Sequence, residues 1–146
     1  MNKDELVKEF SKMMKLSHKI RMKQIQKNRF FGGEKGILFC IDDLIEENCE
    51  ATPSIISERI NVKRPTVTTS LNSLEEKGYI KRTLDKKDRR KFVISLTEKG
   101  RKCVVEEKQR REEELCHIVE SLGKDDTEKL LELSNKVINI LNRYYN

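Results

Sequence analysis

The sequence is short of aromatic residues, histidine and long apolar runs. Tryptophan is absent, aromatic residues make up 5% of the 146 residues, and only two histidines occur. No run reaches the ~18 consecutive apolar residues that indicate a membrane-spanning helix. The amino-terminal segment mixes charged with apolar residues and does not resemble a secretory signal. We therefore expect a cytoplasmic protein with no membrane partner.

Residues that commonly bind metals or carry out catalysis are sparse and scattered. The four cysteines lack the close C-x-x-C spacing of zinc and iron–sulfur sites, and the two histidines lie far apart in the sequence. Neither a glycine-rich phosphate loop nor a nucleophile motif is present. The sequence thus predicts no metal site, no cofactor, no catalytic residues and no enzymatic activity. The residues concerned are Cys40, Cys49, Cys103, Cys116, His18 and His117, with Cys40 expected in the core.

Charge is abundant and unevenly placed. Hydrophobic residues make up 36% of the chain, charged residues make up 38%, and the net charge is +6. Residues 51–101 carry thirteen basic and six acidic side chains, a net charge of +7, which leaves −1 for the other 95 residues. Positive charge concentrated in one segment favours a polyanionic partner such as nucleic acid. The middle third of the chain is therefore the candidate binding segment, and the two ends are its scaffold.

The spacing of apolar residues and the helix-capping signals predict a mainly α fold with one small β-hairpin. Thr52 followed by Pro53 is a typical helix start, and Lys77 followed by Gly78 is a typical helix end. The charged hexapeptide 85–90 separates two stretches in which apolar and polar residues alternate, as in a hairpin. We expect helices at about 3–29, 34–47, 53–60, 65–77, 97–122 and 125–145, a break at 30–33, and strands at 79–84 and 91–96.

The two short helices at 53–60 and 65–77 form a candidate DNA-reading unit, in which the first helix braces the second across the DNA backbone. With Val67, Leu71 and Leu74 directed inward, the second helix presents side chains that suit base edges: Arg for guanine, Asn for adenine and Thr for the thymine methyl group. A solvated helix face would also explain the Thr and Ser residues, although not the basic pair at the helix entrance. The expected DNA contacts here are Thr52, Ser54, Lys63, Arg64, Thr66, Thr68, Thr69, Asn72 and Ser73.

The predicted hairpin tip holds four basic residues in six. Asp88 stands two residues before Arg90 and can orient its guanidinium through a charge-assisted pair. An oriented arginine at the end of a hairpin suits the narrow, negative minor groove of A·T-rich DNA. Solubilising charge is an alternative explanation for Lys86 and Lys87. The expected DNA contacts at the tip are Lys86, Lys87, Arg89 and Arg90, with Asp88 as the orienting residue.

Residues 51–100 resemble the winged helix-turn-helix of the MarR family of bacterial transcription regulators. The resemblance rests on residues 74–82 (LEEKGYIKR), on the aspartate-x-arginine pair of Asp88 and Arg90, and on residues 96–100 (LTEKG). It implies that the helix beginning at Pro65 is the recognition helix and that Arg90 enters the minor groove. It also implies one MarR-type domain over residues 1–146, with dimerisation helices at 3–30 and 101–146, a helix-turn-helix at about 53–77 and a wing at about 79–96.

The same resemblance implies a homodimeric repressor of a near-palindromic promoter site, responsive to a small aromatic or phenolic effector whose binding residues are unknown. The residues independently favour a dimer, because the apolar stripes at both chain ends exceed what one small core can cover. We expect an effector to change the spacing of the two recognition helices without dissociating the dimer. Non-specific binding to nucleic acid, as by an architectural protein, is the alternative function.

Overall fold

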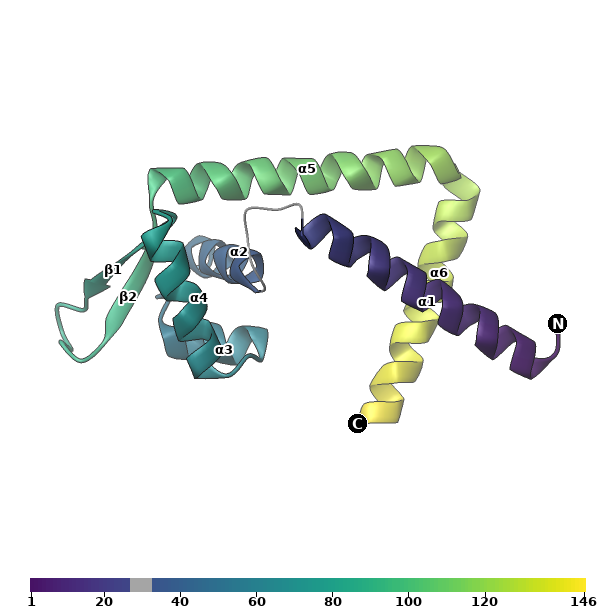
Figure 1. The fold of residues 1–146 in the computed structure, drawn as a ribbon, viewed down its shortest axis with the longest axis horizontal. Helices are drawn as coiled ribbons and strands as arrows, with labels where there is room; N and C mark the ends of the chain where they lie inside the picture. Colours follow the sequence, from purple (N-terminus) through teal and green to yellow (C-terminus); the bar gives the residue numbers. More distant parts are fainter. Residues whose placement is uncertain (27–32) are drawn as a thin grey trace. The chain divides into compact units, whose positions relative to one another are not determined.

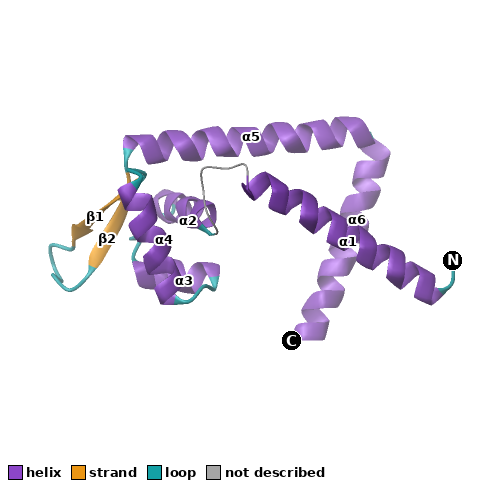
Figure 2. Cartoon of the chain, viewed as in Figure 1, coloured by secondary structure: helices purple, strands orange, loops and turns teal. Residues whose placement is uncertain are grey.

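The computed structural model describes residues 1–26 and 33–146, and it consists of six helices and one hairpin within those residues. The predicted mainly α fold with a small β-hairpin is confirmed (Figures 1 and 2). The expected end of the first helix near residue 29, and most of the expected break at 30–33, lie outside the described residues. The elements are α1 (Lys3–Gln26), α2 (Glu34–Glu46), α3 (Pro53–Ile60), α4 (Arg64–Glu76), β1 (Ile80–Leu84), β2 (Phe92–Leu96), α5 (Glu98–Leu122) and α6 (Lys124–Tyr145).

Local signals explain where α3 begins and ends and where α4 ends. The Thr52 hydroxyl accepts a hydrogen bond from the backbone N–H of Ile55 at 3.3 Å, and Pro53 occupies the first turn, as predicted. Asn61 ends α3 in the left-handed conformation, with φ of 52°. After α4, Gly78 adopts φ of +80°, a backbone conformation that glycine adopts without strain. These signals set the lengths of the two helices of the helix-turn-helix.

One apolar core lies between residues 37 and 104. Helices α2, α3 and α4 pack on one another, and the hairpin lies against α2 and α4 (Figure 1). The predicted inward positions of α4 are confirmed, and Cys40 is buried as expected, which raises the pKa of its thiol above the ordinary value of 9.0. The buried side chains are Ile37, Leu38, Cys40, Ile41, Leu44, Ala51, Ile56, Val67, Leu71, Leu74, Tyr79, Ile80, Ile94, Leu96 and Val104.

The hairpin is antiparallel, with Ile80 opposite Leu96 at one end and Leu84 opposite Phe92 at the other. Ala51 adds a bridge to the second strand, since its carbonyl accepts the N–H of Ile94 at 2.8 Å. Near the core the inward residues are buried, but Leu84 and Phe92 are 52% and 46% exposed. The alternating pattern therefore continues beyond the core, because the hairpin is longer than the surface that it covers.

The chain divides into two compact units, residues 1–104 and residues 105–146. Apolar side chains are exposed along α1 in the first unit, and along the end of α5 and α6 in the second. In the described part of the chain, no helix is long and apolar enough to cross a membrane. The exposed apolar residues include Leu6, Phe10, Met13, Ile20, Leu115, Ile118, Val119, Leu130, Leu133, Val137 and Leu141.

Candidate nucleic-acid interface

Helix α4 presents a polar face because its three inward residues, Val67, Leu71 and Leu74, all point into the core. This placement leaves the predicted reading residues on the outside of the helix. Ser73 is half-buried, whereas the other predicted residues of this helix and its entrance are exposed. The exposed ones are Lys63, Arg64, Thr66, Thr68, Thr69 and Asn72.

The hydroxyl groups of this region differ in what they are free to do. Thr69 Oγ1 donates its proton to the carbonyl of Pro65 at 3.0 Å, so this side chain can contact a base through its methyl group or as a hydrogen-bond acceptor, but not as a donor. Ser54, in the first turn of α3, is exposed. Thr52, an expected DNA contact, is only 4% exposed, and its hydroxyl caps α3. A side chain buried in this way stabilises the start of α3 and is not accessible to DNA.

Arg82 of β1 connects the hairpin to α4. Its Nη2 donates to Oδ1 of Asn72 at 2.7 Å, and its Nη1 lies 3.8 Å from Oε1 of Glu75. The backbone N–H of Arg82 also donates to Oε2 of Glu75 at 3.2 Å. Arg82 is not among the DNA contacts expected from the sequence. Its place in the sequence does carry a signal. Arg82 lies between Ile80 and Leu84, on the apolar side of an alternating strand, and a charged residue there needs a polar partner.

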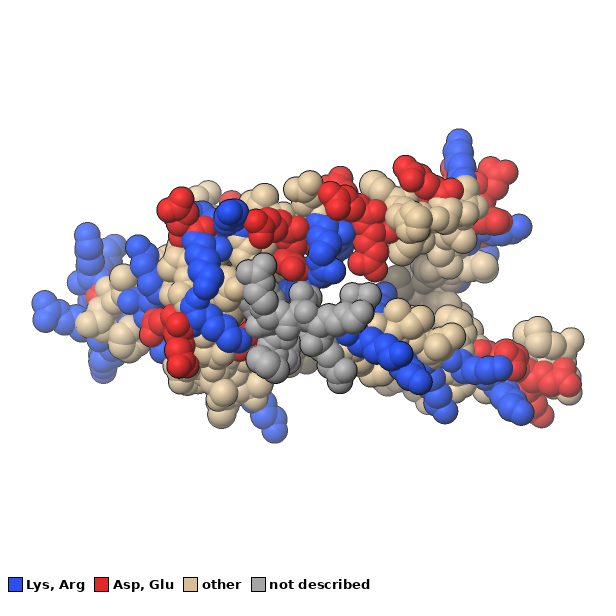
Figure 3. Space-filling view, turned by 45° about the horizontal axis from the view of Figure 1, so that its top comes forward, with Lys and Arg blue, Asp and Glu red and all other residues tan. Residues whose placement is uncertain are grey.

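The hairpin tip is held by two aspartates that bond to the backbone. Asp85 Oδ1 accepts the N–H of Lys87 at 2.9 Å, and Asp88 Oδ1 accepts the N–H of Arg90 at 3.0 Å. Asp88 Oδ1 also lies 3.5 Å from Nε of Arg90, whose side chain is 95% exposed. Asp88 therefore fixes the turn from which Arg90 projects. Lys86, Lys87 and Arg89 are exposed beside it, and basic side chains gather over the hairpin, at the left of Figure 3.

Polar contacts of three lysines, Lys77, Lys91 and Lys99, join the elements around the helix-turn-helix. Glu34 at the start of α2 is only 3% exposed and pairs with Lys77, the C-cap of α4, at 2.7 Å. Lys99 of α5 donates to the carbonyl of Lys77 at 2.6 Å and lies 4.5 Å from the ring centroid of Tyr79. Lys91, the residue before β2, pairs with Glu50 at 2.8 Å, and this hydrogen bond raises the pKa of Lys91.

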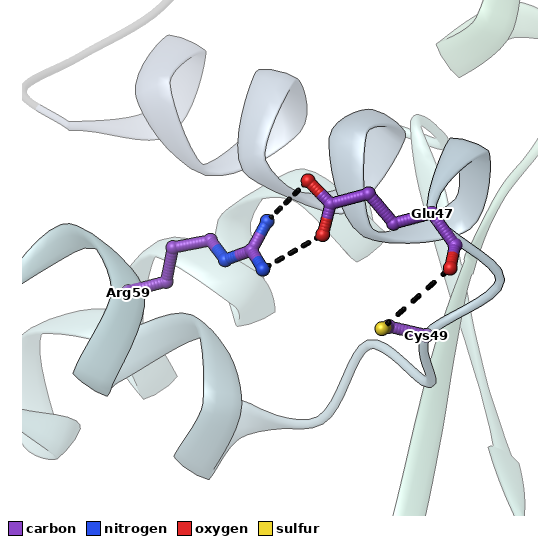
Figure 4. Close-up of polar contacts among 3 residues, drawn as sticks. All are labelled: Glu47, Cys49 and Arg59. Carbon is purple, nitrogen blue, oxygen red and sulfur yellow. Dashed lines mark hydrogen bonds and ion pairs between the residues drawn. The ribbon is translucent and has the colours of Figure 1, made fainter.

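Glu47 and Arg59 join the end of α2 to α3 through two parallel hydrogen bonds, as Figure 4 shows. The distances are 2.9 Å from Nη1 to Oε1 and 2.8 Å from Nη2 to Oε2. The hydrogen bond from Arg59 lowers the pKa of Glu47, and the same contact raises the pKa of Arg59. The exposed thiol of Cys49 lies 3.7 Å from the carbonyl oxygen of Glu47. This bidentate pair fixes α3, the bracing helix, against α2.

The acidic residues offer little for a metal ion. Within residues 1–26 and 33–146, one group of three carboxylates lies close together: Asp42, Asp43 and Glu46 of α2, with oxygens within 4.8 Å of one another. Asp43 and Glu46 are exposed, and exposed acidic groups of this kind are common without an ion. The group therefore does not establish a metal site. His18 and His117 are both exposed and belong to no such group.

Comparison with known proteins places this geometry in a family context. Residues 37–92 match the model of the MarR family. The chain is 34% identical over 94 residues to the HTH-type transcriptional regulator PapX of Escherichia coli, a match that covers 60% of this chain and 57% of PapX. The HTH-type transcriptional regulator SarZ of Staphylococcus aureus is 44% identical over 46 residues, covering 32% of this chain and 31% of SarZ. The chain thus spans little more than half of one relative and about a third of the other.

Solved structures resemble the chain over nearly its whole length. MepR, a transcription regulator of the S. aureus multidrug efflux pump MepA, has a TM-score of 0.70 at 22% identity, and the match covers 97% of this chain and 99% of MepR. FabT of Streptococcus pneumoniae, solved in complex with DNA, has a TM-score of 0.72 at 24% identity, covering 98% of this chain and 99% of FabT. These similarities confirm the expected winged helix-turn-helix fold.

Proposed function

We propose that this chain, which belongs to the MarR family through its winged helix-turn-helix, is a homodimeric transcription regulator that binds double-stranded DNA. The observation that carries the proposal is the pairing of an exposed polar face on α4 with a hairpin whose basic tip is held by backbone hydrogen bonds. Helix α4 has 13 residues, a length that suits the major groove. The proposed contacts are Ser54, Lys63, Arg64, Thr66, Thr68, Thr69, Asn72, Ser73, Lys86, Lys87, Arg89 and Arg90.

Dimerisation is supported by the apolar stripes that one chain leaves exposed. On α6, Leu130, Leu133, Val137 and Leu141 follow helical spacing and are each 39–55% exposed. Packing these stripes against a second copy removes apolar surface from water, at roughly 25 cal/mol for each Å². A two-fold dimer presents two recognition helices, which meet successive major grooves when they lie about 34–36 Å apart. Such a dimer binds a near-palindromic site.

Repression then follows from occupancy of a promoter site, and a small aromatic or phenolic effector would relieve it. The proposal is that the effector changes the distance between the two recognition helices, so that they no longer match successive grooves. Screening such compounds for loss of DNA binding tests this idea. An active compound should leave the dimer intact in sedimentation, whereas compound-induced monomers would contradict the mechanism.

The main experiment compares affinity for a selected sequence with affinity for random DNA. Sequences are first enriched from random double-stranded DNA with the full chain, and both affinities are measured at about 0.15 M salt, because phosphate contacts depend steeply on salt. A specific regulator should prefer its selected site by about 10³-fold or more. A ratio near one would overturn the proposal in favour of non-specific nucleic-acid binding.

A further inference from the structure

We propose that Arg82 is a positioning residue that sets the base specificity of Asn72. The inference rests on the proposed DNA-binding function and concerns one contact within it. Arg82 turns the carbonyl oxygen of the Asn72 side chain toward the hairpin, which leaves the amide NH₂ as the group presented to DNA. Asn72 then reads a hydrogen-bond acceptor on a base edge, and it does not make the two-point contact with adenine that its residue type suggests.

The guanidinium of Arg82 is held in place from two sides. Glu75 accepts the backbone N–H of Arg82 at 3.2 Å, and its other carboxylate oxygen lies 3.8 Å from Nη1. Asn72 stands three residues before Glu75, so both side chains lie on the same side of α4. The side chain of Arg82 is 22% exposed, which limits its freedom to leave this position. The arginine is therefore a fixed donor beside Asn72.

The chemistry of arginine decides which amide atom faces it. Guanidinium carries five N–H donors and no acceptor, so the Asn72 atom at 2.7 Å from Nη2 must be the oxygen. A two-point contact with adenine requires the amide oxygen and nitrogen to face the same base edge, the oxygen accepting from N6 and the nitrogen donating to N7. Here the oxygen is directed at the hairpin. The nitrogen, on the other arm of the amide, donates to none of the residues in 1–26 and 33–146, so both of its N–H groups can donate to DNA.

The consequence is a changed base preference at one position. An NH₂ group alone can donate to O6 or N7 of guanine, to O4 of thymine or to N7 of adenine, and it finds no acceptor on the major-groove edge of cytosine; beside adenine it leaves the N6 donor without a partner. Adenine loses the advantage of its N6 donor, because the oxygen that would accept from it is engaged by Arg82. We expect guanine or thymine to be selected opposite Asn72, with cytosine rejected.

The test uses the full chain and selection from random double-stranded DNA. Comparing the wild type with Asn72→Ala identifies the position that Asn72 contacts, since only there should preference be lost. Arg82→Met then removes the donors but keeps a side chain of similar length. Lys81→Met is the matched control, because Lys81 is exposed on the neighbouring position of β1 and its substitution removes the same charge. Thermal unfolding establishes that each variant is folded.

Arg82→Met should raise the acceptance of adenine at the Asn72 position by at least about fivefold, the lower end of what a good base contact provides. Preferences elsewhere in the site, and all preferences of Lys81→Met, should stay as in the wild type. Selection of adenine by the wild type, or an unchanged preference in folded Arg82→Met, would overturn the inference while leaving the proposed function intact. Absence of any sequence preference in the wild type would overturn both.

A second variant keeps the inference testable if Arg82→Met does not fold. Asn72→Asp retains an oxygen for Arg82 but replaces the NH₂ donors with a second acceptor. Preference at this position should therefore move from guanine or thymine toward bases that offer a donor, cytosine through N4 or adenine through N6. Retained preference for guanine or thymine in Asn72→Asp would contradict the assigned orientation.

Discussion

Arg90 combines a fixed backbone with a side chain that is almost fully in solvent. Its N–H is bonded to Asp88 Oδ1 at 3.0 Å, whereas the one contact of its guanidinium with the described residues is that of Nε with Asp88 Oδ1 at 3.5 Å. The energy that this side chain contributes therefore depends on what it meets outside the chain. A narrow A·T-rich minor groove offers the strongest negative potential for an inserted arginine.

We predict that Arg90→Ala weakens binding most for sites with A·T-rich flanks. The slope of log affinity against log salt should fall by about 0.9, the value of one phosphate charge. Titrations of two probes, identical except for A·T-rich or G·C-rich flanks, measure both effects. Arg89→Ala is the control, because it removes an equal charge from the neighbouring position and should affect the two probes alike. Equal losses on both probes for Arg90→Ala would contradict the wing assignment.

Gly100 is buried where α5 passes the turn between α4 and β1. A Cβ added here would collide with the backbone oxygen of Tyr79 and would lie 3.4 Å from Cδ2 of Leu96. The Tyr79 oxygen cannot withdraw easily, because it accepts the N–H of Thr97 at 3.1 Å. The hydroxyl of Thr97 in turn accepts the N–H of Gly100 at 3.1 Å and donates to Gly78 at 2.6 Å. A glycine at this position permits the close approach.

We predict that Gly100→Ala lowers the free energy of unfolding by about 1–3 kcal/mol, the usual cost of forcing an extra methyl group into a packed site. Urea unfolding measures the change. Gly36→Ala provides the opposite control, because Gly36 lies within α2 and a Cβ there meets no atom of the described part of the chain within 4 Å. That substitution should stabilise the fold by about 0.5–1 kcal/mol through helix propensity. Equal stability of the two variants would refute the packing argument.

At the scale of whole elements, the contact between α2 and α3 depends on an acid that titrates. The hydrogen bond from Arg59 holds the pKa of Glu47 below its ordinary value of 4.5. A carboxyl whose pKa is lower in the folded chain stabilises the fold above its unfolded pKa, and this stabilisation is lost as the pH falls through the folded pKa. The bridge is exposed, so we expect a modest effect that salt weakens.

We predict that Glu47→Gln destabilises the protein near neutral pH and that the difference from the wild type disappears in acid. Urea midpoints of both proteins, measured between about pH 7 and about pH 3, test this prediction. Glu58→Gln is the control, since Glu58 lies beside Arg59 on α3 and takes no part in the bridge. A difference between wild type and Glu47→Gln that persists at the acid end would show that something other than the ion pair is responsible.

Local signals fixed the elements of the binding segment more reliably than their contacts. The Thr52 cap, Pro53 and Gly78 act within one turn of the chain, so the bounds of α3 and the end of α4 could be predicted from neighbouring residues alone. The link from Arg82 to Asn72 joins positions ten apart in different elements, and it depends on how the hairpin lies against α4. Periodicity along one element carries no information about that placement.

The exposure of the hairpin residues and the burial of the α3 cap also depend on the whole fold. The alternation of apolar and polar residues places Leu84 and Phe92 on the same side of the hairpin as the buried residues. Both are nevertheless exposed, because the core does not extend that far along the hairpin. The type of residue at Thr52 suits either a helix cap or a phosphate contact, and only the fold shows that its hydroxyl is buried in the cap. Burial depends on the whole fold, so a local sequence pattern does not contain it at either site.

At the scale of the whole molecule, charge and apolar surface occupy different stretches of the chain. The net charge of +7 lies in residues 51–101, whereas the exposed apolar stripes lie on α1, on the end of α5 and on α6. The core cluster contains none of the α6 residues. Substitutions on α6 should therefore alter association between copies without unfolding the winged helix-turn-helix.

We predict that replacing both Leu133 and Val137 with Gln converts the proposed dimer to a monomer. Neither change alters the charge of the chain, so any loss of DNA binding results from the loss of the second winged helix-turn-helix. The affinity for the selected site should fall by about 10²- to 10⁴-fold, the range in which linking two binding modules strengthens binding. Sedimentation gives the oligomeric state, and titration with the selected site and random DNA gives the affinities.

The control introduces two glutamines at other positions of α6. Asn135 and Asn139 stand two residues beyond Leu133 and Val137, which is about 200° around the helix, so replacing both with Gln leaves the apolar stripe intact. That variant should remain a dimer with wild-type affinity. A variant at Leu133 and Val137 that becomes monomeric yet binds the selected site as tightly as the wild type would show that one winged helix-turn-helix suffices. The proposal of a near-palindromic site would then be wrong, because a single winged helix-turn-helix does not require a second half-site.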